Sequence, residues 1–326
     1  MTTPVYLFGI DIGGTKIGIG LGDSTGRILT ESRIDNRNTR PEDILPQLVN
    51  EARRFMRENR LEASDIAMFG ISSPSPADIP NGIITTPPNN PYWRNVPIKS
   101  YLEQELRIRG SFENDANCGA LAEWYFGAGA GCTDVIYLAM STGIGAGIIA
   151  GGRLIRGKGF LAGEIGHTVQ TPGGRLCNCG LRGCYEAYCG GRAVAQRLVE
   201  EVESVPDHPM RAYAPEGKVE LLDLPALIRA ARDKVDYAVK LWDEICFRNA
   251  QAYGALMNIF NPERLILGTI VWNNGDFFLD PVRQYLPRFA WRETLAKCEL
   301  VPSALKQNLG SYAGIAGARY ALEQSR

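Results

Sequence analysis

The sequence uses one strand–turn–strand pattern twice. Residues 5–23 hold an apolar run, the glycine turn of DIGGTK and a second apolar run, and residues 134–152 repeat this order around STGIGAG. Apolar runs beside glycine turns predict buried strands joined as hairpins. Two equivalent hairpins in a chain of mixed strands and helices predict a two-lobed α/β protein with a cleft between its lobes.

Length and charge narrow the class of protein. A chain of 326 residues is long for one core, and two domains are the natural expectation. The 35 basic and 36 acidic side chains leave a formal net charge of −1, and no run of five like charges occurs, so we expect no nucleic-acid partner. No signal-peptide pattern and no apolar run of roughly 18 residues is present, which predicts a cytoplasmic protein without a membrane segment.

The first glycine turn predicts a phosphate site. Asp11 ends the first apolar run, Gly13 and Gly14 form the turn, and Thr15 and Lys16 follow. Glycines allow backbone N–H groups to approach phosphate oxygens. Asp11 is placed to hold Mg²⁺ or its waters, because Mg²⁺ commonly takes one or two carboxylates together with phosphates.

The second glycine turn offers Thr142, Gly143 and Gly145 to the other end of a triphosphate. Either turn alone is more often a simple tight turn. The Rossmann and Walker A patterns are both absent, so those two modes of nucleotide binding do not apply. Two such turns, each after an apolar strand, favour phosphate binding.

Two polar residues, Asn114 and Asp115, lie between a predicted strand and a predicted helix. Sugar phosphorylation needs a carboxylate that accepts the hydroxyl proton as the oxygen attacks the γ-phosphate. Asp115 is our candidate for this base, with Asn114 orienting a neighbouring hydroxyl. The alternative is a helix N-cap, for which Asn and Asp are both preferred.

The segment GEIGHTVQTPGGRLCNCGLRGCYE predicts a metal centre. It holds His167, Cys177, Cys179 and Cys184 in the pattern H-x9-C-x-C-x4-C. One imidazole and three thiolates complete a tetrahedral Zn²⁺ site, and a closed ligand set indicates a structural metal. The alternative is three buried or redox-active thiols beside an unrelated histidine. The chain has only two histidines, which favours zinc.

Two glutamates bracket this motif, Glu164 before the histidine and Glu186 after the last cysteine. A metal-bound imidazole can use its second ring nitrogen for an outward hydrogen bond. The metal could thus fix His167 so that it and both glutamates face one polyhydroxyl ligand. Solvated surface charge is the alternative for either glutamate alone.

Taken in order, the motifs DIGGTK, ENDAN, STGIGAG, GEIGH and CNCGLRGCYE resemble the ROK family (repressors, open reading frames, kinases), most of all its bacterial glucokinases and N-acetylhexosamine kinases. The resemblance implies an actin/hexokinase-like (ribonuclease H-like) fold, with a smaller lobe of residues 1–117 plus 305–326 and a larger lobe of residues 118–304. It implies ATP as phosphoryl donor, Mg²⁺ as cofactor and a homo-oligomer, commonly a dimer.

The resemblance also assigns roles to residues. It implies that Asp115 is the catalytic base. It implies that the sugar is bound by Asn114, Asp115, Glu164, His167 and Glu186. It implies that zinc is bound by His167, Cys177, Cys179 and Cys184.

Two positions depart from the family pattern. Ser75, in GISSPSPAD, replaces a glycine that borders the sugar, and its bulk could alter which hydroxyl or N-acyl group fits. Thr269, in LILGTIVWNNG, replaces the second of two glycines on the adenine side, where an unusual backbone angle would be harder for threonine to adopt.

We therefore expect an ATP-dependent kinase for a hexose, with glucose at its 6-hydroxyl as the first choice. N-acetylmannosamine, N-acetylglucosamine, fructose or a cyclitol are alternative acceptors. A sugar-responsive repressor would need a DNA-binding helix-turn-helix, and only ten residues precede Asp11. A catalytically silent sugar sensor is the third hypothesis.

Overall fold

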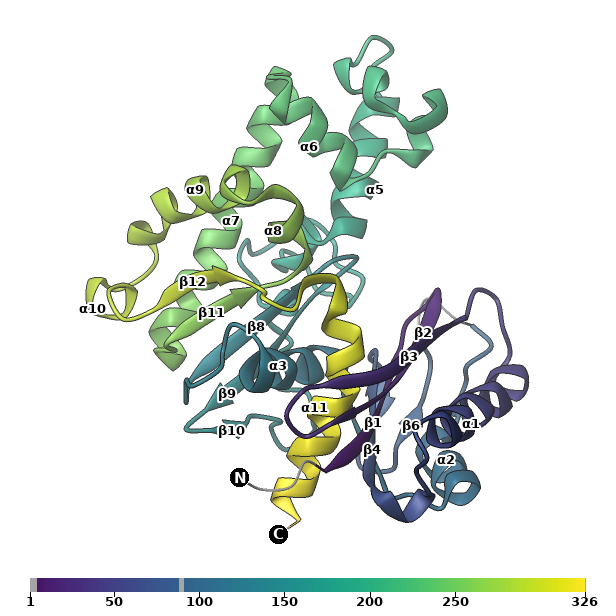
Figure 1. The fold of residues 1–326 in the computed structure, drawn as a ribbon. Helices are drawn as coiled ribbons and strands as arrows, with labels where there is room; N and C mark the ends of the chain where they lie inside the picture. The colour runs from purple at the N-terminus through teal and green to yellow at the C-terminus, as the bar shows by residue number, and fades with distance from the viewer. Residues whose placement is uncertain (1–4, 88–90, 326) are drawn as a thin grey trace.

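A computed structural model describes residues 5–87 and 91–325, and Figure 1 shows two twisted sheets side by side, with helices around them. The first sheet, in the order β3-β2-β1-β4-β7, comprises Tyr6–Ile12 (β1), Lys16–Asp23 (β2), Ile28–Asp35 (β3), Ile66–Ser73 (β4) and Gly110–Asn114 (β7). The second, in the order β10-β9-β8-β11-β12, comprises Val135–Met140 (β8), Ile144–Ala150 (β9), Arg153–Leu154 (β10), Arg264–Leu267 (β11) and Glu299–Pro302 (β12).

The two sheets are built alike, which confirms the predicted repeat and the two-lobed α/β fold. Strand β1 pairs antiparallel with β2 and parallel with β4. Strand β8 likewise pairs antiparallel with β9 and parallel with β11. Each hairpin therefore ends at a glycine turn on the corresponding edge of its sheet. A short ribbon of Ala77–Asp78 (β5) and Ile83–Ile84 (β6) follows β4.

Helices cover both faces of the first sheet. Pro41–Glu58 (α1) and Ile98–Leu106 (α2) pack their apolar sides onto one face and share a core with Phe69 and Ile71 of β4. Because side chains alternate along a strand, Met68 and Gly70 face the other way, toward the C-terminal helix Leu309–Gln324 (α11).

The contact between α11 and the first sheet depends on glycine. A Cβ atom on Gly70 would lie 2.1 Å from the carbonyl oxygen of Gly314, and one on Gly9 would lie 2.6 Å from the backbone nitrogen of Ile315. Helix and sheet can approach this closely only because no side chain separates them. The same helix also packs against Asp115–Phe126 (α3), so α11 lies between the two sheets (Figure 1).

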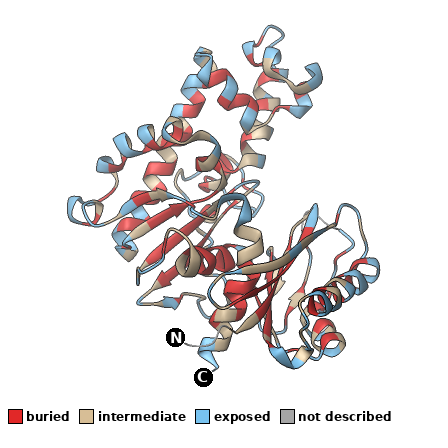
Figure 2. Ribbon diagram, viewed as in Figure 1, coloured by how far each residue is buried: buried red, intermediate tan, exposed pale blue. Residues whose placement is uncertain are grey.

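The second sheet has α3 on one face and a larger helical layer on the other. Figure 2 shows buried residues concentrated in the sheets and in the helices beside them, while the outermost helical turns are exposed. The larger layer comprises Glu186–Cys189 (α4), Gly191–Glu203 (α5), Leu224–Arg232 (α6), Asp236–Phe260 (α7), Thr269–Asn274 (α8), Asp276–Tyr285 (α9) and Arg292–Leu295 (α10).

The lobe boundaries agree with the strand content of each sheet but stay a prediction. All five strands of the first sheet end by Asn114, and the second sheet begins at Val135. The segment that leads into α11 is fastened to α3 by Glu123, whose buried carboxylate accepts hydrogen bonds from the side chain of Ser303 and the backbone N–H of Leu305. Among the described residues, no helix combines the length and apolar character that a bilayer crossing requires.

Candidate active site

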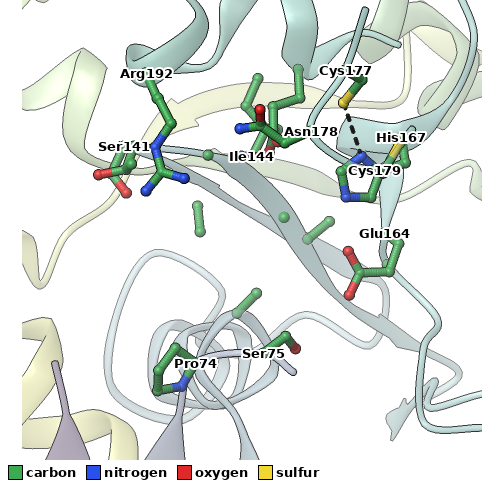
Figure 3. A pocket seen from close by; sticks show the side chains of 18 of the residues that line it. Pro74, Ser75, Ser141, Ile144, Glu164, His167, Cys177, Asn178, Cys179 and Arg192 are labelled. Atoms are coloured by element: carbon green, nitrogen blue, oxygen red, sulfur yellow. Dashed lines mark hydrogen bonds between the residues drawn. The ribbon is translucent and has the colours of Figure 1, made fainter. Parts of the chain in front are cut away.

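A cavity of about 520 Å³ opens between the two sheets (Figure 3). All of the predicted sugar-binding residues line it: Asn114, Asp115, Glu164, His167 and Glu186. They come from the end of β7, the start of α3, the loop after β10 and the start of α4. The structure thus brings together residues that the sequence separates, and it places Asn114 and Asp115 opposite the cysteine-rich segment.

Asn114 and Asp115 both accept hydrogen bonds at the start of α3, and both line the cavity. Asn114 is the N-cap of α3, and its Oδ1 accepts hydrogen bonds from the backbone N–H groups of Ala116 at 2.9 Å and Asn117 at 3.3 Å. Asp115 is the first helical residue, and its Oδ1 accepts from the N–H of Ala116 at 2.8 Å. Capping therefore occupies the only side-chain oxygen of Asn114 and places Asp115 at the cavity wall.

The electrostatic surroundings of Asp115 suit a general base. Its carboxylate is open to the cavity but lies deep between the two sheets. Loss of hydration there raises its pKa to about 6, and the negative charges of Asp11 and Glu164 act in the same direction. A carboxylate with a pKa raised in this way is ionised at neutral pH and is also a better proton acceptor than an ordinary aspartate.

The opposite wall carries the zinc motif. The Nδ1 atom of His167 lies 3.6 Å from the Sγ of Cys177, and the Sγ atoms of Cys179 and Cys184 lie 3.7 Å apart. The four donor atoms all fall within 4.8 Å of one another. Ligands about 2.0–2.3 Å from a tetrahedral Zn²⁺ would be separated by roughly 3.5–3.8 Å. The spacing of these donors therefore fits a zinc ion.

The two glutamates beside this motif differ in what holds them. Glu186 accepts a hydrogen bond from the backbone N–H of Ile144 at 2.7 Å, which ties the cysteine-rich segment to the second glycine turn. Burial raises the pKa of Glu164, and the neighbouring His167 opposes this shift. In Figure 3, Glu164 and His167 face the same space. A polyhydroxyl ligand there would meet two carboxylates and one imidazole.

The first glycine turn is present but lies outside this cavity's lining. Asp11 sits at the end of β1, and its Oδ1 accepts a hydrogen bond from the hydroxyl of Ser72 at 2.8 Å. Burial raises the pKa of Asp11. Asn36 fastens the turn by donating from its side-chain amide to the carbonyl of Gly13 at 2.8 Å. Sequence reasoning missed Asn36, because a single asparagine after a strand carries no recognisable signal.

The second glycine turn lies where two cavities meet. Its Gly143 and Gly145 line the first cavity, and Thr142 lines both the first and a second cavity of about 720 Å³. Helices α6 and α8 supply much of the second cavity, through residues that include Leu224, Ile228, Arg229, Ile270 and Asn273. Apart from the departure at Thr269, no motif predicts this cavity, because its residues are scattered along the chain and converge only in the fold.

Thr269 does not strain the backbone. Thr269 is the first residue of α8, and Gly268 is the N-cap. Thr269 is not one of the non-glycine residues that have a positive φ. A helical position accepts threonine without the steric penalty that a left-handed one would impose. Thr269 therefore does not need the unusual backbone angle that a threonine would find hard to adopt, and the residue lines the second cavity.

Comparisons with known proteins identify the family of this chain. The family model described as "ROK family" matches residues 7–325. The glucokinase of Thermotoga maritima is 33% identical over 308 residues, which cover 93% of this chain and 94% of that protein. Xylose repressors match as well; that of Caldicellulosiruptor bescii is 29% identical over 92% of this chain and 74% of its own length.

Solved structures give the same result. A ROK hexokinase from Thermus thermophilus superposes with a TM-score of 0.85 at 28% identity and covers 98% of this chain and 100% of its own. A ROK family glucokinase from Streptomyces griseus, in complex with glucose and AMPPNP, has a TM-score of 0.75 at 29% identity. The match covers 98% of this chain and 100% of the Streptomyces chain. With a family model matching from the first strand to the last helix, this chain belongs to the ROK family.

Proposed function

We propose that this protein is an ATP-dependent hexose kinase that phosphorylates glucose at its 6-hydroxyl, with Asp115 as the general base. The similarity to curated glucokinases and to a glucokinase structure makes the chain a sugar phosphotransferase. One observation carries the assignment of the base: Asp115 lines a cavity whose other wall presents Glu164, His167 and Glu186, a set of groups suited to sugar hydroxyls.

The reaction follows from this arrangement. The sugar hydroxyl gives its proton to the carboxylate of Asp115 while its oxygen forms a bond to the γ-phosphorus of ATP. The bond between that phosphorus and the β–γ bridging oxygen breaks, and ADP leaves with the electron pair. Asn114 is held in place as the N-cap of α3, and it would orient the neighbouring sugar hydroxyl relative to Asp115.

The nucleotide has a natural place in the second cavity. Its walls of Leu224, Ile228 and Ile270 are apolar, as an adenine ring requires, and Arg229 and Asn273 add polar groups. From there the triphosphate would extend along the turn at Thr142, Gly143 and Gly145 toward the first cavity. The turn with Gly13, Gly14, Thr15 and Lys16 would approach the phosphates from the facing lobe.

Magnesium fits Asp11. This carboxylate is a hard oxygen donor at the end of a strand beside the first glycine turn, and Mg²⁺ prefers such oxygen ligands. Burial raises the pKa of Asp11, and a bound cation would favour the charged form. A bound Mg²⁺ ion would neutralise part of the phosphate charge. The hydrogen bond from Ser72 would hold the carboxylate of Asp11 in place beside it.

Zinc is our proposal for the His167, Cys177, Cys179 and Cys184 cluster, on the strength of the donor spacing. With Nδ1 facing the thiols, the Nε2 of His167 points away from the cluster. A metal fixed here would therefore orient the imidazole toward the sugar.

An assay of ADP release tests the function. The protein would be incubated with MgATP and, in turn, glucose, mannose, fructose, N-acetylglucosamine, N-acetylmannosamine, glucosamine and inositol. We expect glucose to give the highest kcat/KM. If another sugar is preferred, the kinase assignment stands and glucose is replaced as the acceptor. If no acceptor causes ADP release, the kinase assignment is contradicted.

A sugar sensor is the second candidate, because a xylose repressor matches over 92% of this chain. A sensor would bind a sugar without consuming ATP. Calorimetry with the same sugars in the absence of ATP separates the two functions, since a sensor shows binding in calorimetry together with silence in the ADP assay.

We also propose a cytoplasmic location and a homo-oligomer. Three thiolates can serve a metal only where they stay reduced, as in the cytoplasm. Light scattering after size-exclusion chromatography measures the oligomer directly.

A further inference from the structure

Three residues line both cavities: Ser141, Thr142 and Arg192. A phosphoryl group that moves from a nucleotide in the second cavity to an acceptor in the first must pass them. Ser141 and Thr142 form the second glycine turn, and Arg192 is the second residue of α5. The place where the two cavities meet is therefore formed by one turn and the beginning of one helix.

The backbone holds Arg192 at this point. Its N–H donates to the carbonyl of Thr142 at 3.0 Å, and the N–H of Gly191 donates to the carbonyl of Ser141 at 2.9 Å. These two bonds fasten the start of α5 to the glycine turn. A Cβ on Gly191 would lie 2.7 Å from the Ser141 carbonyl oxygen, so the close approach needs glycine there. The position of Arg192 relative to the turn is consequently rigid.

The side chain of Arg192 is exposed, and Figure 3 shows its guanidinium reaching into the cavity beside Ser141. Among the described residues that line the first cavity, it is the only lysine or arginine, against the carboxylates of Asp115, Glu164 and Glu186. These acids suit sugar hydroxyls but repel a phosphoryl group. A cation is therefore needed where the phosphoryl group enters, and Arg192 supplies it.

We propose that Arg192 binds the γ-phosphoryl group of ATP and stabilises its charge during transfer to the sugar. The inference rests on the proposed kinase function and adds a catalytic residue to it. A guanidinium offers a planar fork of N–H donors that matches two phosphoryl oxygens at once, which a lysine ammonium does not. Groups of this kind act mainly on the transition state, where the charge on the transferred oxygens is spread between donor and acceptor.

Kinetics of Arg192→Met and Arg192→Lys test the proposal. We expect Arg192→Met to lower kcat by about 10²–10³-fold while KM for the sugar changes less than about threefold, and Arg192→Lys to recover only part of the loss. Arg232→Met is the comparison within the second cavity, because Arg232 lines that cavity and not the first. It should raise KM for ATP more than it lowers kcat. Arg292→Met, exposed at the start of α10, is the control outside both cavities.

A transition-state mimic gives a readout that a structural role would not change. ADP with aluminium fluoride and sugar should inhibit the wild-type protein more tightly than ADP alone. Arg192→Met should lose most of this difference and keep its affinity for ADP. Wild-type kcat in Arg192→Met, or an unchanged preference for the mimic, would overturn the inference. An inactive wild-type protein would instead overturn the proposed function. If Arg192→Met does not fold, the comparison of Arg192→Lys with wild type decides alone.

Discussion

The side-chain amide of Asn114 donates a hydrogen bond to the hydroxyl of Ser75 across a distance of 3.0 Å. Ser75 lies in the loop after β4 and Asn114 at the end of β7, so the bond joins the carboxyl ends of two neighbouring strands. Both residues line the first cavity. The serine that departs from the family's usual glycine therefore contacts a residue that we propose binds the sugar.

Replacing Ser75 with glycine should change which sugar is preferred. Ser75→Gly removes a side chain from the cavity wall and leaves the amide of Asn114 without this partner. We expect kcat/KM for N-acetylhexosamines, relative to glucose, to rise by about tenfold, the size of effect that one hydrogen bond or a small steric change produces. The sugar panel measures this ratio. Ser100→Gly, away from the cavity, is the control, and an unchanged ratio in Ser75→Gly would show that Ser75 has no influence on specificity.

Replacing Asp115 with asparagine should abolish most turnover and leave sugar binding largely intact. Asparagine has nearly the same shape but cannot accept the hydroxyl proton, so kcat should fall by about 10²–10⁴-fold. Calorimetry with the preferred sugar should give a dissociation constant close to the wild-type value. Asp207→Asn, on an exposed loop, should behave as wild type. Near-normal turnover in Asp115→Asn would refute the base assignment.

The pH dependence of kcat/KM for the sugar should show the ionisation of Asp115. The base works only when deprotonated, and its pKa is raised to about 6. Activity should therefore be on a plateau above that pH and fall about tenfold for each unit below it. The residual activity of Asp115→Asn should lack this acid limb. If both proteins lose activity at the same pH, another group controls the profile.

Removing one cysteine of the metal cluster should affect metal and sugar together. Cys179→Ser replaces a thiolate by a poor zinc ligand, so bound zinc should fall well below the wild-type content, as measured by atomic emission. Because His167 belongs to the cluster and also lines the cavity where we propose that the sugar binds, KM for the sugar should rise about tenfold or more. Cys132→Ser, outside the cluster, should retain both properties. Loss of zinc with an unchanged KM would disprove the coupling between the two.

The sequence predicted the parts of the site that depend on distinctive residues close together in the chain. The glycine turns, the Asn114–Asp115 pair and the cysteine-rich segment all carry their chemistry within a few neighbouring positions. Arg192 and Asn36 do not, because each owes its place to a partner far away in the sequence. An arginine at the start of an amphipathic helix looks like any solvated charge until the fold places it between two cavities.

The helices show the same limit. Helical spacing covers residues 223–260, but the structure divides this stretch at Lys234, whose φ of 62° is left-handed. No glycine or proline marks the break, so local patterns could not find it. Strand β12 was also missed, because a strand of four residues has too few positions to show alternation.

The packing of α11 has a consequence for the order in which the protein acquires its structure during synthesis. Helix α11 fills one face of the first sheet, through contacts as close as that between Gly70 and Gly314. A ribosome makes the strands of that sheet long before it makes this helix. During synthesis, one apolar face of the first sheet therefore stays uncovered until residues 309–324 have left the ribosome. Chaperones that bind exposed apolar surfaces would contact the nascent chain in that interval.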